Sequence, residues 1–233
     1  MVAALVLLLP LLPFTLPFPY RMRYRLLTQW GRFNIWWVGI TCGLRYRVEG
    51  IENIPKGPAI ILAKHQSAWE TFALQKIFPP QTWVLKRSLL WIPIFGWGLA
   101  LLYAIAIDRG AGRAALHQVI TQGTDRLKRG IWVVIFPEGT RTAPGARRRY
   151  NIGGAMLAEK SGYPVVPVAH NAGEFWSRRS FGKKPGEITI VIGPVIEPTG
   201  KGAGDINREV EEWIEGTMLR ISHVASPATA GAD

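Results

Sequence analysis

Short apolar runs alternate with longer segments of helical periodicity from residue 44 onward. The runs are rich in Val and Ile and end at polar or turn-forming residues, which is typical of buried strands. The expected strands are residues 44–49, 58–63, 82–86, 104–107, 131–136, 165–169 and 187–192, with 44–49 at a sheet edge. The expected helices are residues 69–78, 111–129, 152–161 and 205–219, and 89–102 is a broken helix or a membrane-facing loop. This alternation predicts an α/β fold with a central, largely parallel or mixed sheet flanked by helices.

Polar residues directly follow three of the expected strands. His65 comes after the 58–63 strand, Asp108–Arg109 after the next but one, and the polar segment 138–141 after the 131–136 strand. In sheets of this kind, ligands bind outside the carboxyl ends of the strands. We therefore expect these three groups to meet at one edge of the sheet.

The first 44 residues lack the strand pattern and are mostly apolar. Residues 1–20 carry no charged side chain and are long enough to span a bilayer, but four prolines interrupt the helix that a span requires. No Lys or Arg precedes this run and no small-residue cleavage site follows it, so it is a poor signal peptide. Arg21, Arg23 and Arg25 come next, which suits an anionic headgroup region.

A second apolar stretch contains Trp36 and Trp37 and lies between Arg32 and Arg45. It is too short to span a bilayer and suits an interfacial or re-entrant helix. Because arginines flank both ends, both ends are expected on the cytoplasmic side, which is the inner membrane in a bacterium. We therefore interpret the N-terminal segment as a helical membrane anchor. The alternative is a pair of buried helices in a soluble domain.

The chain thus divides into an anchor at residues 1–44, an α/β domain at 45–220 and a disordered tail at 221–233. Charged residues make up 19% of the chain, below the roughly 25% of soluble domains, and there are ten tryptophans, which indicates contact with lipid. The net charge of +12 favours an anionic partner: a membrane surface, a phosphorylated substrate or a nucleic acid. The single Cys42 excludes an internal disulfide, and its spacing from the four histidines predicts no metal site.

The segment KHQSAWE places His65 at a strand-to-helix junction and Glu70 about one turn into the following helix. A carboxylate on one ring nitrogen fixes the imidazole tautomer and leaves the other nitrogen free to take a proton. This is the base half of a catalytic triad without an enzyme nucleophile. A satisfied structural histidine is the alternative for this pair.

The segment FPEGTR carries the second candidate constellation. Gly139 permits a tight turn that brings backbone N–H groups near a phosphate, with Thr140 beside it. Arg141 can bind a phosphate in bidentate fashion, and Glu138 can anchor Arg141 or a glycerol hydroxyl. Arg109, held by Asp108, is a second candidate phosphate ligand. A solvated loop with a structural salt bridge is the alternative.

Together these motifs resemble the lysophosphatidic acid acyltransferase family, the glycerolipid acyltransferases. The resemblance covers about residues 45–195, and the motifs occur in the family's order. The matching segments are His65 with Glu70, Ile107–Arg109, Phe136–Arg141, Val166–Val168 and, between the first two motifs, Lys86–Gly96.

The resemblance implies a role for each matching residue. His65 would deprotonate an acceptor hydroxyl, the sn-2 hydroxyl of lysophosphatidic acid, which attacks an acyl thioester directly, and Glu70 would orient His65. The acceptor phosphate and glycerol would be held by Arg109, Glu138, Gly139, Thr140 and Arg141. Pro167 would shape the acyl-donor side. The donor would be acyl-CoA or acyl-carrier protein, the product phosphatidic acid, and no metal or other cofactor is implied.

Four positions depart from the family pattern. The usual acid is Asp, whereas Glu70 is one methylene longer, and Lys64 replaces a small polar residue before the histidine. Tyr103 and Ala106 stand where the family has Gly and Phe. These changes leave the reaction type intact and leave the acceptor open, for example to a lyso-ornithine lipid.

Other functions are less consistent with the residues. A covalent hydrolase is disfavoured because there is no G-x-S-x-G elbow and Cys42 lies in the expected anchor, although water could still replace the acceptor. A non-catalytic lipid-binding protein would leave the His65–Glu70 pair without a purpose. No nucleic-acid-binding motif is visible, and the basic residues flank the anchor and the FPEGTR loop, so we expect no nucleic acid partner.

Overall fold

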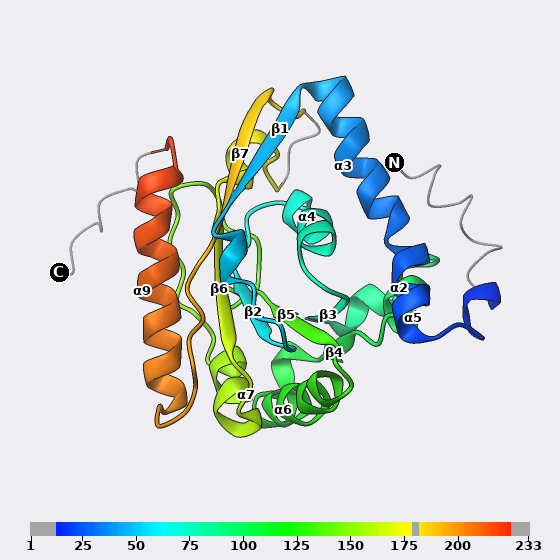
Figure 1. Cartoon of the computed structure of the whole chain (residues 1–233), viewed down its shortest axis with the longest axis vertical. Helices are drawn as coiled ribbons and strands as arrows, with labels where there is room; N and C mark the ends of the chain where they lie inside the picture. Colours follow the sequence, from blue (N-terminus) through cyan, green and yellow to red (C-terminus); the bar gives the residue numbers. More distant parts are fainter. Residues whose placement is uncertain (1–12, 179–181, 225–233) are drawn as a thin grey trace.

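The structure is a computed structural model of the chain, and it describes residues 13–178 and 182–224. A seven-stranded sheet forms its centre, in the order β1-β7-β6-β2-β5-β3-β4 (Figure 1). β6, β2, β5, β3 and β4 run parallel, whereas β7 runs antiparallel to β6, and β1 runs parallel to β7. The predicted α/β fold is confirmed, with a mixed sheet. The strands are β1 (Leu44–Glu49), β2 (Ile60–Ala63), β3 (Gln81–Lys86), β4 (Ile105–Ile107), β5 (Trp132–Ile135), β6 (Val165–His170) and β7 (Gly186–Ile192).

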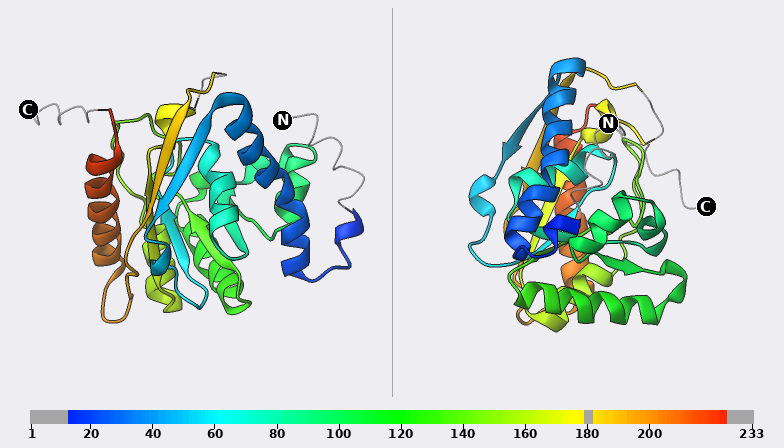
Figure 2. Two further views of the ribbon diagram at one scale, coloured as in Figure 1. Left: turned by 45° about the horizontal axis from the view of Figure 1, so that its top comes forward. Right: turned by 90° about the vertical axis from the view of Figure 1, so that its right-hand side faces the viewer.

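Helices cover both faces of this sheet (Figures 1 and 2). The α-helices are α2 (Tyr20–Leu27), α3 (Gln29–Cys42), α4 (Trp69–Ile77), α5 (Phe95–Leu101), α6 (Arg113–Lys128), α7 (Gly153–Ser161), α8 (Ala172–Phe175) and α9 (Ala203–Ile221). The short 3₁₀ helices are η2 (Pro13–Thr15), η3 (Ile51–Asn53), η4 (Arg87–Trp91) and η5 (Arg109–Ala111). All the strands expected from the sequence form, and β1 lies at the sheet edge as predicted.

The side chains of β2 show how the two layers are built. Ile61 and Ala63 pack into the core beneath α3 and α4, while Ile60 and Leu62 pack into the core beneath α6, α7 and α9. Alternate residues of a strand point to opposite faces, so a strand covered on both sides must be apolar throughout. All four residues are fully buried, which explains the continuous apolar run in the sequence.

Two proline-linked boundaries follow from backbone chemistry. α4 ends before Phe78, whose φ of −98° and ψ of 162° are extended, as expected for a residue that precedes a proline. The expected broken helix forms as η4 and α5, separated at Pro93. This break turns the 87–102 segment across the carboxyl end of the sheet, near the predicted site.

The N-terminal segment forms two helices, α2 and α3, beside α4 and α5 (Figure 1). One face of α3 packs against α4, while the opposite face exposes large apolar side chains. The exposed residues on α3 are Phe33, Trp36, Trp37 and Ile40. Among residues 13–178 and 182–224, no helix combines the length and apolar character needed to cross a bilayer. Residues 1–12 of the expected anchor and residues 225–233 of the predicted tail lie outside the described residues. The first part of that tail is described: α9 continues to Ile221, and Ser222 and His223 form hydrogen bonds to Glu174.

Candidate active site

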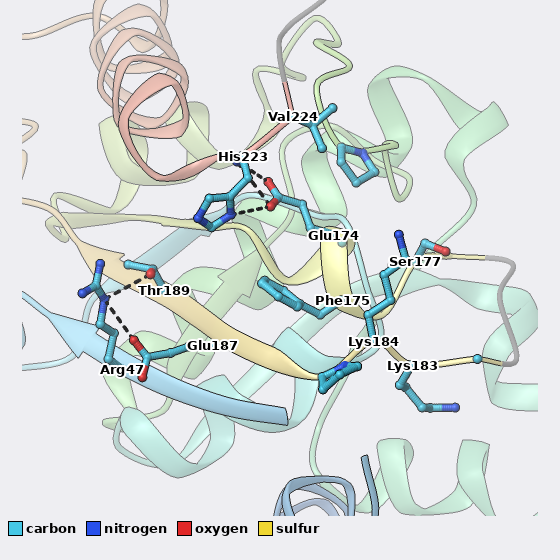
Figure 3. Close-up of a pocket in the computed structure, with 14 residues that line it drawn as sticks. Arg47, Glu174, Phe175, Ser177, Lys183, Lys184, Glu187, Thr189, His223 and Val224 are labelled. Carbon is cyan, nitrogen blue, oxygen red and sulfur yellow. Dashed lines mark hydrogen bonds and ion pairs between the residues drawn. The ribbon is translucent and has the colours of Figure 1, made fainter. Parts of the chain in front are cut away.

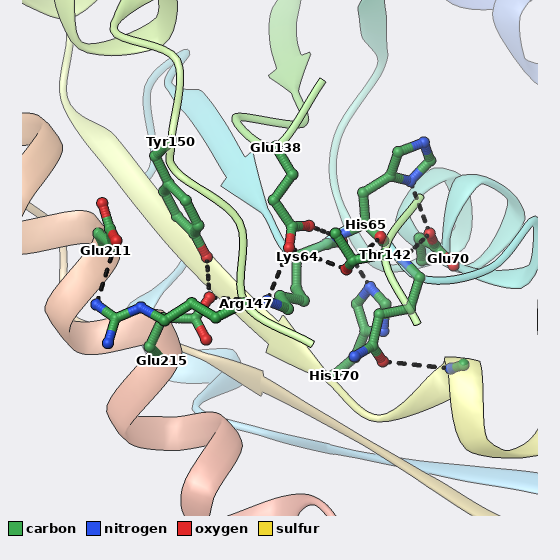
Figure 4. Close-up of polar contacts among 12 residues, drawn as sticks. Lys64, His65, Glu70, Glu138, Thr142, Arg147, Tyr150, His170, Glu211 and Glu215 are labelled. Carbon is green, nitrogen blue, oxygen red and sulfur yellow. Dashed lines mark hydrogen bonds and ion pairs between the residues drawn. The ribbon is translucent and has the colours of Figure 1, made fainter. Parts of the chain in front are cut away.

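His65 and Glu70 meet at the carboxyl end of β2. Nδ1 of His65 lies 2.9 Å from Oε1 of Glu70 (Figure 4). An ionised carboxylate can only accept a hydrogen bond, so Nδ1 carries the proton and donates it. Nε2 then holds a lone pair, which is the state that a general base requires. The contact predicted from the sequence is confirmed, and the longer Glu side chain reaches the ring.

The same carboxylate oxygen accepts backbone hydrogen bonds at the start of helix α4. Oε1 of Glu70 accepts hydrogen bonds from the backbone N–H groups of Gln66, at 3.0 Å, and Ser67, at 2.9 Å. Oγ of Ser67 accepts one from the N–H of Trp69, at 3.2 Å. The Glu70 carboxylate therefore satisfies two backbone donors just before α4. One side chain therefore fixes both the start of α4 and the orientation of the imidazole.

Phe136 packs on one face of the His65 imidazole. Its ring stacks on the His65 imidazole with centroids 4.0 Å apart and an interplanar angle of 13°. Phe136 directly follows β5, and β5 pairs in parallel with β2, so strand pairing brings the two residues together. The His65 side chain is 15% exposed. The ring is thus held by Glu70 at its edge and by Phe136 on its face.

Burial and hydrogen bonding set the ionisation of the groups behind His65. Burial by itself raises the pKa of Glu70, but the hydrogen bonds from His65 and from the backbone N–H of Ser67 outweigh it and hold that pKa below its usual value. Burial lowers the pKa of His170, which outweighs attraction to Glu70. His170 is therefore neutral at pH 7, and the hydrogen bonds from His65 and Ser67 keep Glu70 ionised there.

A cavity of about 260 Å³ lies beside His65. Its walls come from α2, α3, α4, β3 and the η4–α5 segment, and they are mostly apolar. The apolar lining residues are Leu27, Trp30, Phe72, Trp83, Val84, Leu85, Leu89, Ile94, Phe95, Leu99, Leu102 and Phe136. A mostly apolar cavity with few convergent polar groups is the usual form of a small-molecule site.

Two of the predicted phosphate ligands line this same cavity. Arg109 and Arg141 contribute to its wall with His65, although they follow different strands. No carboxylate within residues 13–178 and 182–224 forms an ion pair with either guanidinium. Partial burial lowers the pKa of Arg109, but an arginine stays protonated at neutral pH. Oδ1 of Asp108 accepts the N–H of Gly110, at 3.0 Å, instead of holding Arg109 as expected.

Glu138 faces the protein interior. Its side chain is buried, Oε1 lies 2.7 Å from Nζ of Lys64, and Oε2 accepts the backbone N–H of His65 at 2.7 Å (Figure 4). Oγ1 of Thr142 also donates to Oε1, at 3.0 Å. Both carboxylate oxygens are thus engaged by protein donors, and Glu138 does not line the cavity. Glu138 therefore does not contact Arg141, and it does not face the cavity where a glycerol hydroxyl would bind, in contrast to the prediction.

The remaining predicted residues take structural positions. Gly139 closes the expected tight turn, with a φ of 69° and its N–H donating to the carbonyl of Phe136 at 2.9 Å, so this N–H is already used. Thr140 follows it, half-buried and outside the cavity lining. Pro167 lies within β6 and close to Gly193 on the α9 face, opposite α4. Pro167 does not line the cavity, so no contact in the cavity supports its predicted role of shaping the acyl-donor side.

A larger and more open groove of about 880 Å³ lies between β7, α8 and the end of α9 (Figure 3). It contains a second histidine–carboxylate pair, with Nδ1 of His223 2.9 Å from Oε2 of Glu174. Glu174 also accepts from Oγ of Ser222, at 2.6 Å, and from the N–H of His223. These bonds fasten the end of α9 to α8. None of the predicted site residues lines this groove, so the chemistry belongs to the smaller cavity.

The chain is similar to known proteins over most of its length. The family model described as Acyltransferase matches residues 45–171. A 1-acyl-sn-glycerol-3-phosphate acyltransferase of Pseudomonas aeruginosa is 49% identical over 210 residues, covering 88% of this chain and 82% of that protein. The chain belongs to the acyltransferase family. It is therefore an enzyme, as the motifs predicted.

More distant relatives of this acyltransferase extend the comparison. A protein of Chlamydomonas reinhardtii with the same activity in its name is 30% identical, covering 90% of this chain and 62% of that protein. The crystal structure of the 1-acyl-sn-glycerophosphate acyltransferase of Thermotoga maritima has a TM-score of 0.72 at 24% identity, covering 84% of this chain and 78% of that one. The latter supports the fold.

Sequence reasoning missed three residues around the base in this acyltransferase. Phe136 falls at the end of a predicted strand, and nothing in the sequence indicates that its ring stacks on His65. Lys64 and His170 are not among the predicted site residues, although both are fully buried beside the site. A lysine directly before the candidate base, where the family has a small polar residue, was the available signal for Lys64.

Within the described part of the chain, no group of three or more His, Cys, Asp or Glu residues could hold a metal ion.

Proposed function

We propose that this acyltransferase transfers a fatty acyl group from an acyl-CoA or acyl-carrier-protein thioester to the sn-2 hydroxyl of lysophosphatidic acid, and so makes phosphatidic acid for phospholipid biosynthesis. The names of its relatives support this acceptor. The observation that carries the proposal is the cavity, which combines an oriented imidazole, an apolar interior and two guanidiniums that form no ion pair with a carboxylate in the described part of the chain.

Each part of the cavity suits one part of the substrates. The guanidiniums of Arg109 and Arg141 match an acceptor phosphate, because planar N–H donors bind phosphate oxygens in pairs. A lyso-ornithine acceptor lacks that phosphate, so the pair of arginines favours lysophosphatidic acid. The apolar walls beyond His65 suit a fatty acyl chain.

In the proposed reaction, Nε2 of His65 takes the proton of the acceptor hydroxyl as its oxygen attacks the thioester carbonyl carbon. The carbon–oxygen bond forms, and the tetrahedral intermediate then expels the thiolate. The imidazolium returns its proton to the leaving sulfur, which restores the neutral base. Glu70 stabilises the imidazolium between these steps because its charge lies 2.9 Å from Nδ1.

The test is acyl transfer to lysophosphatidic acid by the detergent-purified protein, with palmitoyl- and oleoyl-CoA and with acyl-carrier protein as donors. His65→Ala should lower kcat at least about a hundredfold, the lower end of general-base contributions. His117→Ala is the matched control, because His117 is an exposed histidine on α6. Thermal melts of all three proteins establish that they are folded.

Three results would contradict the proposal. Full activity in His65→Ala would remove the assigned base. Release of free fatty acid without an esterified product would make the protein a thioesterase. Transfer to a lyso-ornithine lipid with a higher kcat/KM than to lysophosphatidic acid would change the acceptor.

We also propose that the protein works at a membrane surface through its N-terminal helices. α3 exposes Trp36 and Trp37, and the η4–α5 segment exposes Trp91 and Trp97. Exposed apolar surface near basic residues is typical of membrane contact. The expected anchor would then lie in the interface.

Sedimentation with phosphatidylglycerol-containing vesicles tests this placement. The variant Trp36→Ser/Trp37→Ser should lose most of its vesicle binding, because both indoles lie on the exposed face of α3. Leu219→Ser is the control, since it removes an exposed apolar side chain on α9. Equal binding by the double variant and the wild type would refute the assigned surface.

A further inference from the structure

A buried lysine lies directly behind the candidate base. The Lys64 side chain is 1% exposed, and its Nζ lies 2.7 Å from Oε1 of Glu138 and 2.7 Å from Oε1 of Glu215 (Figure 4). A buried ammonium without a partner is strongly unfavourable, so these carboxylates are what allow it to stay charged in the interior. The three residues come from three separate places in the chain: the end of β2, the FPEGTR loop and α9.

Glu138 connects this lysine to the backbone of His65. Its second oxygen, Oε2, accepts the N–H of His65 at 2.7 Å, while Thr142 donates its N–H to the carbonyl oxygen of His65 at 2.8 Å. Both peptide groups of His65 are therefore held by the 138–142 segment. The residue that bears the imidazole is thus fixed from behind, independently of the contact between its ring and Glu70.

Glu215 connects the lysine to the opposite layer of the fold. It lies on α9, and its Oε1 also accepts a hydrogen bond from the hydroxyl of Tyr150 at 2.8 Å. Burial raises the pKa of Tyr150, and the charges of Glu215 and Glu138 raise it further, so the hydroxyl remains a donor. Lys64 is thereby held between a helix on one face of the sheet and the loop at its carboxyl edge.

We propose that Lys64 is a positioning residue for His65: its ammonium, anchored by Glu215 on α9, holds the Glu138 carboxylate against the backbone N–H of the base. This rests on the proposed role of His65. It gives Glu138 a positioning function in place of acceptor binding. It also gives a reason for a lysine to occupy the position before the histidine, since only a long cation reaches both carboxylates.

The first test compares Lys64→Met with the wild type under saturating donor and acceptor. Methionine has a similar length without the charge. Because misplacement of a catalytic group by about 1 Å lowers rates on the order of a hundredfold, we expect kcat to fall roughly 10- to 100-fold. KM for both substrates should change less than about threefold, because the cavity arginines are untouched. Lys160→Met, at an exposed lysine on α7, is the matched control.

A double-mutant cycle separates positioning from general stability. If Lys64 acts through Glu138, then Lys64→Met should lower kcat in the wild type but not, beyond about twofold, in the Glu138→Gln background. The double variant Lys64→Met/Glu138→Gln removes one buried cation and one buried anion together. It therefore keeps the test available if Lys64→Met alone does not fold.

The outcomes are distinct. A folded Lys64→Met with kcat within threefold of the wild type overturns the inference, and so does a further fall of more than about fivefold when Lys64→Met is added to Glu138→Gln. A loss confined to KM also overturns it. Activity that survives in His65→Ala instead overturns the proposed function, so the two failures are distinguishable.

Discussion

Replacing Glu70 by glutamine removes the negative charge beside the base while keeping the side chain's shape. The backbone N–H groups of Gln66 and Ser67 both point at the accepting oxygen, so they select the amide oxygen of the glutamine for that position. Nδ1 of His65 therefore keeps its proton and the tautomer is unchanged. What is lost is the attraction between a carboxylate and the imidazolium that forms during the reaction.

The size of this loss follows from hydrogen-bond energies. A bond to a charged group contributes about 1.5–3 kcal/mol and a neutral one about 0.5–1.5 kcal/mol, so the variant should lose on the order of 1–1.5 kcal/mol in the transition state. This corresponds to a decrease in kcat of about 5- to 15-fold. KM for the acceptor should stay the same, because the cavity arginines are not involved.

The assay is the initial rate of phosphatidic acid formation at saturating substrates and pH 7.5, for the wild type, Glu70→Gln and His65→Ala. Glu187→Gln, at an exposed position of β7, is the control for adding an amide elsewhere. Wild-type kcat in Glu70→Gln would show that the carboxylate charge has no part in the reaction. A kcat as low as that of His65→Ala would show that the glutamine has flipped, against the argument from the two backbone donors.

Three further predictions concern the acceptor, the acyl chain and pH. Arg141→Gln should raise the acceptor KM about 10- to 100-fold by removing a charged hydrogen bond of about 1.5–3 kcal/mol, and an unchanged KM would exclude it as a phosphate ligand. Gly98→Leu should lower kcat/KM about tenfold for palmitoyl donors but not for octanoyl donors, because Gly98 lines the cavity and an added side chain would extend into open space. Gly216→Leu, at an exposed position of α9, should affect neither donor. His170, whose pKa is lowered, binds a proton mainly in the unfolded chain, so stability measured by urea denaturation should fall between pH 7 and pH 5 by at most about 1.4 kcal/mol per pH unit. His170→Gln should flatten that dependence, and an equal slope in the variant would contradict the assignment.

The sequence predicts the elements well because strand burial and helix periodicity are local signals. Residues 60–63 and 165–169 are apolar throughout, since both faces of their strands are covered. The strand order is not predicted in the same way, because nothing local indicates that β7 runs antiparallel to β6 or that β1 pairs with β7. The alternation therefore supports a parallel or a mixed sheet equally.

For the site, the sequence predicts convergence but not direction. His65, Arg109 and Arg141 line one cavity. They follow β2, β4 and β5, and these strands run parallel in the sheet, so their carboxyl ends lie at the same edge. The FPEGTR motif predicts that Glu138 faces the acceptor, yet the Glu138 carboxylate faces the protein interior. The reason is Lys64, a buried cation whose effect on Glu138 depends on a contact between distant segments that only the folded chain reveals.

The position of β1 has a consequence for the order of events during synthesis. Within the described residues, β1 pairs with β7 alone, and about 140 residues separate the end of β1 at Glu49 from the start of β7 at Gly186. A ribosome that adds about 5–20 residues per second needs about 7–28 s to make that interval. For this time the nascent chain carries the aromatic face of α3 next to an unpaired strand. Encounter with a lipid surface can thus precede closure of the sheet, and the bilayer would then act as the first folding partner of the N-terminal helices.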